Sequence, residues 1–264
     1  MGGVFRLRRG KALVVCGVPL VGLIAAAVLA PLPFSVAVPG LTANVLGTYK
    51  GAQVVTVTGV PTRRTSGQLR MTTIAATGPA QDVYLGDVVD GWFRTDQAVM
   101  PRDSVYPGGG NTREIERRNT EEMRKSQNTA TAAALAYLGR SPSEVHVRLR
   151  LANVGGPSAG LLFSLGIVDK LAGDGKGGDL TGGRVVAGTG TITSRGSVGA
   201  VGGVALKTQA ARRDGATVFL VPEAECSDAR AELPKGLRLV PVSTLKGAVQ
   251  ALRALKSGGS VPSC

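Results

Sequence analysis

The chain has 264 residues, of which 31 are Lys or Arg and 18 are Asp or Glu, so its formal net charge is +13. Its 38 glycines and 14 prolines make up about a fifth of the chain, which is below the level of low-complexity disorder, and the absence of a Gly-X-Y period excludes collagen. Three cysteines and one histidine, His146, exclude a disulfide scaffold, a four-thiolate zinc site and any metal site that needs two histidines.

The first predicted element is an apolar helix that follows a basic amino terminus. An uncharged run over residues 12–34 is long enough to span a bilayer, and the only nearby charges are the cations between Arg6 and Lys11. The positive-inside rule then places the start in the cytoplasm. We expect residues 1–34 to form a cytoplasmic tail and a single-pass anchor of the cell membrane, with an extracytoplasmic body. The alternative is a signal peptide cleaved after Ala30, which Pro31 disfavours.

Residues 35–110 are predicted to form a small N-terminal β region. Within it, residues 53–58 and 69–76 are rich in β-formers and are separated by turn formers, so we expect two neighbouring strands. Residues 111–138 predict one long helix with a charged, solvated face, because oppositely charged residues stand four positions apart and Gly139 ends the pattern.

The second half alternates strands with helices, which is typical of a mixed α/β (α+β) domain, here over residues 111–258, with 259–264 as a tail. The strictly alternating residues 145–151 place His146 on an exposed polar face. The glycine-rich residues 173–183 predict a surface loop. The expected helices are 158–172, 203–214 and 244–256, and the expected strands are 145–151, 184–193, 218–221 and 237–242.

A candidate nucleophile lies between a predicted strand and an apolar helix, in the segment Gly-Pro-Ser158-Ala-Gly. A serine at a helix amino terminus lies beside unpaired backbone N–H groups that can stabilise an oxyanion. The alternative is a glycine-rich turn in which Ser158 is a plain N-cap. The pattern also fits the Gly-x-Ser-x-Gly of α/β-hydrolases, but that fold needs a histidine after the serine, and His146 precedes it.

A serine nucleophile without a later histidine needs another base, and lysine is the documented alternative. At the ordinary pKa of about 10.4, only about one lysine in a thousand is neutral near pH 7, so the base must be buried to lower its pKa. Lys207 fits because Val204 and Ala211 share its helical stripe. The alternative is an ordinary helix lysine. We expect Ser158 Oγ and Lys207 Nζ to lie within hydrogen-bond reach, roughly 2.6–3.2 Å.

Three motifs in this order resemble the proteolytic domain of the Lon proteases over about residues 125–255. They are Gly-Pro-Ser158-Ala-Gly, Thr189-Gly-Thr-Ile-Thr and Val-Gly-Ala-Val-Gly-Gly-Val-Ala-Leu-Lys207. The resemblance implies a serine–lysine dyad that cleaves peptide bonds, with Ser158 as nucleophile, Lys207 as general base and Thr189 orienting the lysine. It also implies an oxyanion hole formed by backbone at Gly156, Pro157 and Ala159.

The chain looks most similar to membrane-anchored, ATPase-free PDZ–Lon proteins of Gram-positive bacteria, with three departures. No room remains for a PDZ domain between Gly139 and the strand at 145, Gly155 stands where ATP-dependent members carry an aspartate, and the loop 173–183 is long. No Gly-x-x-x-x-Gly-Lys-Ser/Thr motif is present, so we expect no ATPase and no cofactor. The expected activity is an ATP-independent serine endopeptidase that acts on loose or unfolded polypeptides.

The remaining expectations concern partners. Cys226 and Cys264 could form a disulfide in an external body, or stay free thiols. The resemblance suggests a homo-oligomeric ring. The alternative to a protease is a non-catalytic envelope module that keeps the fold for binding or assembly. Nucleic acid is not an expected partner, because the basic residues are dispersed and aromatic residues to stack bases are scarce.

Overall fold

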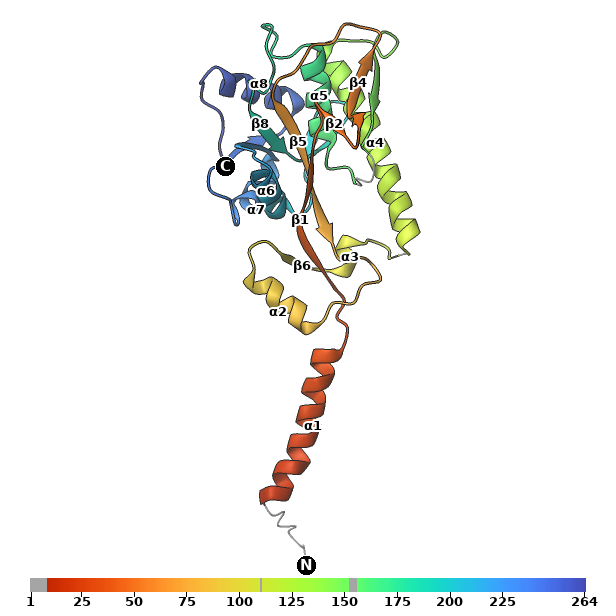
Figure 1. Ribbon diagram of the computed structural model, residues 1–264, viewed down its shortest axis with the longest axis vertical. Helices are drawn as coiled ribbons and strands as arrows, with labels where there is room; N and C mark the ends of the chain where they lie inside the picture. The colour runs from red at the N-terminus through yellow and green to blue at the C-terminus, as the bar shows by residue number, and fades with distance from the viewer. Residues whose placement is uncertain (1–8, 110, 152–155) are drawn as a thin grey trace, which may run out of the picture.

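The computed structural model, which describes residues 9–109, 111–151 and 156–264, is built around a six-stranded sheet (Figure 1). The strand order is β12-β11-β8-β5-β1-β6. Strands β5, β8, β11 and β12 run parallel, whereas β1 is antiparallel to both of its neighbours. The six strands are β1 (Phe34–Asn44), β5 (Gln68–Ala76), β6 (Ala98–Pro101), β8 (Val185–Gly188), β11 (Val218–Pro222) and β12 (Arg238–Val242).

Helices cover both faces of this sheet, and each face has its own core. The larger core joins one face to α4 (Thr112–Leu138), α5 (Gly160–Leu171) and α8 (Leu245–Lys256), and the smaller core joins the other face to α6 (Val204–Arg213) and α7 (Cys226–Arg230). Alternation along β11 divides its side chains, since Leu220 belongs to the larger core and Phe219 to the smaller one. The predicted mixed α/β class is therefore confirmed.

Short elements lie outside the main sheet. Strand β7 (His146–Leu149) exposes His146, as its alternating pattern predicts. The short strand pairs are β2 (Thr48–Tyr49) with β3 (Ala52–Gln53), β4 (Val55–Thr58) with β7 (His146–Leu149), and β9 (Thr191–Ile192) with β10 (Val198–Gly199); the short helices are α2 (Leu85–Phe93), α3 (Arg102–Val105) and η1 (Glu223–Glu225).

Two elements predicted from local sequence signals differ in outcome. The long helix is confirmed as α4, which Asn111 caps through its side chain and which Gly139 ends in the left-handed conformation. The single strand predicted over 184–193 is wrong, because the chain turns between β8 and β9 at Gly190, whose φ is +150°.

The boundary predicted at residue 110 is also wrong, because residues 35–110 are not a separate β region. Strands β1 and β5 belong to the same sheet as β8, and Gln68 on β5 pairs with Val185 on β8. The predicted neighbours 53–58 and 69–76 do not pair with each other, since β4 pairs with β7 instead. Pairing between segments so far apart leaves no local pattern. The tail 259–264 also packs against the body, where Val261 is buried in the larger core.

Helix α1 (Arg9–Leu29) points away from the body (Figure 1). The apolar run continues beyond it, but Pro31 and Pro33 cannot extend the helix. In the three described ranges, no helix combines the length and the apolar character that a membrane crossing requires. The transmembrane anchor predicted for residues 1–34 is therefore not supported, and the location of the chain stays a prediction.

Candidate active site

The predicted nucleophile lies in a tight turn just before α5. Ser158 is half-buried there, and Ala159 is the N-cap of the helix, without a side-chain capping hydrogen bond. The alternative interpretation of Ser158 as a plain N-cap is therefore wrong. The carbonyl oxygen of Ser158 accepts hydrogen bonds from Gly190 N at 2.9 Å and from Thr189 Oγ1 at 3.3 Å. These bonds fix the backbone of the turn, while the Ser158 side chain lines a cavity.

Helix α4 supports the same turn from another side. Ser126 Oγ donates to the carbonyl oxygen of Pro157 at 3.0 Å. Gly160 follows the turn at a point of close approach, since a Cβ there would lie 3.0 Å from Ile192 Cγ2 and 3.2 Å from Ser126 Oγ. The glycine of the Ser-Ala-Gly motif thus lets α5 pack closely against β9 and α4.

The predicted base, Lys207, lies in the first turn of α6, and its side chain is buried. The residue is only 3% exposed, and its Nζ donates to Thr189 Oγ1 at 3.2 Å. Burial lowers the pKa of Lys207 to about 8, although the nearby carboxylate of Glu225 acts in the opposite direction. With that pKa, about one Lys207 in ten is neutral at pH 7. Lys207 is therefore not an ordinary, exposed helix lysine.

Thr189 connects the two predicted catalytic residues. Its hydroxyl donates to the carbonyl oxygen of Ser158 and accepts from the amine of Lys207, so both of its hydrogen-bonding functions are used. The expected direct hydrogen bond between Ser158 Oγ and Lys207 Nζ is not among those formed by the described side chains. The residues are instead brought together around one cavity, with Thr189 between them.

That cavity has a volume of about 460 Å³, and both Ser158 and Lys207 line it. Part of its wall comes from α3, from α4 and from the chain between them. Arg118 on α4 holds that connecting chain by donating to Pro107 O at 2.6 Å and to Gly109 O at 3.3 Å. The lining is mixed. Its apolar residues include Ile74, Val105, Pro107, Ile115 and Val201, and its polar or charged residues include Thr73, Ser104, Arg118, Asn119, Glu122 and Thr191.

The predicted oxyanion hole needs one correction. Pro157 has no N–H group and cannot donate, and its carbonyl oxygen instead accepts from Ser126 Oγ. Gly156 N donates weakly to Asn119 O at 3.5 Å. Ala159 N, by contrast, has no acceptor among the residues described around it. Gly155, where the family pattern has an aspartate, lies outside the described residues.

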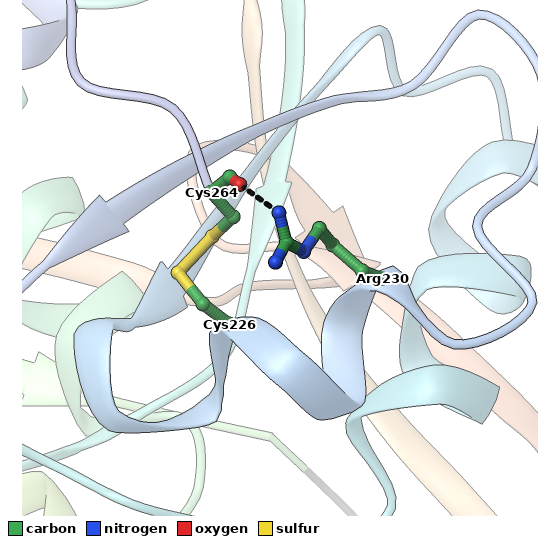
Figure 2. The surroundings of a disulfide bond; sticks show 3 residues. All are labelled: Cys226, Arg230 and Cys264. Carbon is green, nitrogen blue, oxygen red and sulfur yellow. Dashed lines mark hydrogen bonds between the residues drawn. A yellow bond between two sulfur atoms is a disulfide. The ribbon is translucent and has the colours of Figure 1, made fainter.

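The two distant cysteines form a disulfide. Cys226, the first residue of α7, is bonded to Cys264, with Cα atoms 5.3 Å apart (Figure 2). Arg230 reaches from the same helix and donates to the carbonyl oxygen of Cys264 at 2.7 Å. The disulfide therefore fastens the tail to α7.

Two residues near the cavity were missed by the sequence reasoning. Ser126 is one of several polar residues in a helix, and no local signal shows that its hydroxyl faces the serine turn. Glu225 is a buried carboxylate that follows the apolar strand β11. No local signal separates it from Glu223, the exposed acidic residue that directly follows the strand. Among the residues that the structure describes, no group of three or more His, Cys, Asp or Glu side chains could hold a metal ion.

Comparison with known proteins shows the family of the chain. Residues 120–253, about half of the chain, match the family described as "Lon protease (S16) C-terminal proteolytic domain". The chain is also similar to "Lon protease 1" of Sorangium cellulosum (strain So ce56), at 30% identity over 193 residues that cover 68% of this chain and 22% of that protein. The chain thus spans about a fifth of the length of this relative. The similarity to membrane-anchored PDZ–Lon proteins stays a prediction. The predicted resemblance to the Lon proteolytic domain is confirmed, and the chain belongs to the Lon protease family through this C-terminal proteolytic domain.

Proposed function

We propose that the protein is an ATP-independent serine endopeptidase in which Ser158 and Lys207 act as a catalytic dyad. The observation that carries this proposal is that both residues line one cavity, where Lys207 is buried and hydrogen-bonded to Thr189. A neutral amine has two N–H bonds and one lone pair. One N–H is engaged by Thr189 Oγ1, which leaves the lone pair for the hydroxyl of Ser158.

In the proposed reaction, Ser158 Oγ attacks the scissile carbonyl carbon while its proton passes to Lys207 Nζ. The carbon–nitrogen bond then breaks, and Lys207 returns the proton to the leaving amine. Water attacks the resulting ester, again giving a proton to Lys207, and the acid product leaves as Ser158 regains its proton. The backbone N–H of Ala159 is the candidate donor to the oxyanion, since it precedes α5 and has no described acceptor.

The proposed substrates are loose or unfolded polypeptides. The cavity lining is mixed, and its apolar side chains, such as Ile74, Ile115 and Val201, can contact the apolar groups that an unfolded chain exposes. The chain also lacks a phosphate-binding Gly-x-x-x-x-Gly-Lys-Ser/Thr motif with which it could drive unfolding itself. Assembly into a ring and attachment to a membrane stay predictions from the sequence.

Cleavage of unfolded casein by the full chain tests the proposal. We expect Ser158→Ala and Lys207→Met each to lower the rate by at least about a thousandfold, because each removes one member of a unit that acts together. Methionine keeps the volume of the buried stem while removing the base. Ser143→Ala and Lys246→Ala change exposed residues of the same types and should keep the wild-type rate. A wild-type rate in either dyad variant would contradict the proposal.

The absence of a direct hydrogen bond between Ser158 and Lys207 favours one second candidate, a non-catalytic module that keeps the fold for binding or assembly. A fluorophosphonate probe separates the two candidates because only an activated serine reacts with it. Labelling at Ser158 that depends on Lys207 supports the peptidase. Failure to label the folded wild-type chain, together with no cleavage of casein, supports the module.

A further inference from the structure

A buried carboxylate next to the cavity is not a member of the proposed dyad. Glu225, at the end of η1, is 8% exposed, and its Oε1 accepts a hydrogen bond from Val201 N at 3.0 Å. Its other oxygen, Oε2, is buried and has no hydrogen-bond partner among the described residues. A carboxylate is costly to bury in this way, and burial raises the pKa of Glu225. The local fold therefore carries a cost that its single hydrogen bond does not offset.

The hydrogen bond from Val201 links this carboxylate to the site. Val201 lines the cavity together with Ala200 and Gly202, and this segment leads directly into α6. Gly203 begins α6 in the left-handed conformation, and Lys207 N donates to Gly203 O at 3.1 Å in the first helical turn. Glu225 thus fixes both the cavity wall at 200–202 and the starting point of the helix that carries the lysine.

Glu225 is also the charged group that acts on Lys207. Its negative charge favours the protonated form of the lysine, and Lys207 in turn lowers the pKa of Glu225. Two other charged residues, Arg118 and Glu122, line the cavity from α4, and Asp228 on α7 acts on Glu225. In the proposed reaction, Lys207 becomes a cation each time it takes the proton of Ser158. A buried cation needs a compensating charge.

We propose that Glu225 is a positioning residue of the dyad: it holds the cavity wall at 200–202 through Val201 N and supplies the counter-charge for Lys207 when the lysine is protonated. This role rests on the proposed peptidase function. In this role, the negative charge of Glu225, whose Oε2 has no hydrogen-bond partner among the described residues, stabilises Lys207 when the lysine is protonated. The proposed role also gives a function to the negative charge at a place where a neutral amide could make the same hydrogen bond to Val201.

The test is the pH dependence of kcat/KM for casein cleavage by the full chain carrying Glu225→Gln. Glutamine keeps an oxygen acceptor for Val201 N but removes the charge. In the wild type, kcat/KM should rise with pH towards the pKa of Lys207 at about 8, because the base must be neutral. This rise is the acidic limb of the profile, and the constant kcat/KM above it is the plateau. In Glu225→Gln the limb should move to lower pH by roughly one unit, and the plateau should fall by roughly tenfold.

Two matched variants separate charge from structure. Glu223→Gln removes an exposed charge from the same short helix and should leave both the limb and the plateau unchanged. Glu225→Asp keeps the charge but shortens the reach to Val201, so its limb should stay in place while its plateau falls. A purely structural role predicts a lower plateau in Glu225→Gln with no movement of the limb, and that result would overturn the proposal.

The remaining outcomes are also decisive. If Glu225→Gln fails to fold, Glu225→Asp carries the test, and a wild-type plateau in that variant overturns the positioning role. If the wild type neither cleaves casein nor reacts with a fluorophosphonate at Ser158, the peptidase function itself fails. An active wild type with superimposable pH profiles for Glu225→Gln refutes only the role of Glu225.

Discussion

At the scale of single residues, Thr189 has the most constrained position in the site. Its side chain is fully buried, and its hydroxyl bonds to the Ser158 carbonyl on one side and to the Lys207 amine on the other. A hydroxyl that already donates to a carbonyl can only accept from the lysine. Thr189 therefore fixes which way the amine of Lys207 is turned, and it ties that direction to the backbone of the nucleophile.

Replacement of Thr189 by valine and by serine should separate shape from hydrogen bonding. Thr189→Val keeps the volume and removes both hydrogen bonds, so we expect casein cleavage to fall by roughly 10- to 100-fold, as a lost bond to a charged or catalytic amine implies. Thr189→Ser keeps the hydroxyl and should retain most of the rate. Steady-state kinetics of the two variants, with thermal unfolding as a control for folding, make the measurement. Equal losses in both variants would contradict the bridging role.

At the scale of elements, α5 is buried along almost its whole length, from Gly160 to Asp169. A helix enclosed in this way normally carries apolar residues only. Asp169 interrupts the rule near the end of α5, where its Oδ1 accepts from Leu180 N at 2.8 Å and its Oδ2 is buried without a described partner. The carboxylate ties the glycine-rich loop 173–183 to the helix. Burial raises the pKa of Asp169 to about 6.

Asp169→Asn should therefore change stability in a pH-dependent way. The folded protein holds the proton of Asp169 more tightly than the unfolded chain does, so the wild-type free energy of unfolding falls as pH rises from about 3.8 to about 6. The loss is complete above that range and amounts to at most about 3 kcal/mol. Asparagine cannot ionise, so its stability relative to wild type should rise between pH 4 and pH 8. Urea unfolding at the two pH values measures this, and a constant difference would contradict it.

At the scale of the whole molecule, the elements and candidate residues that could be predicted from the sequence are those that short-range signals determine. Asn111 and Gly139 act on the helix between them, so α4 was predicted almost to the residue. The dyad candidates followed from motifs that are each contiguous. Strand β1 was not predicted as one strand because Pro39 and Gly40, which usually interrupt a strand, lie inside it, where its register shifts. Burial of Glu225 depends on packing between η1 and the segment at Val201, which no local pattern contains.

The disulfide is the other long-range connection with a measurable effect. It closes a loop across a sequence separation of 38 residues, and the chain-entropy argument gives a stabilisation of about 4 kcal/mol. The double variant Cys226→Ser/Cys264→Ser should therefore unfold at a clearly lower urea concentration. Reductant should have the same effect on the wild type. Cys16→Ser removes an exposed free thiol and serves as the control. A midpoint insensitive to both treatments would show that the bond adds nothing.

The parallel pairing of β5 with β8 has a consequence for how the chain is made. Gln68 and Val185 are partners, so a growing polypeptide cannot complete its central sheet until Val185 has left the ribosome. At common translation speeds this is roughly 6 to 23 s after Gln68. During that interval β5 has one edge without its final neighbour, and an open strand edge recruits other chains. Biosynthesis therefore includes an obligatory waiting period in which the nascent amino-terminal half depends on shielding from its surroundings.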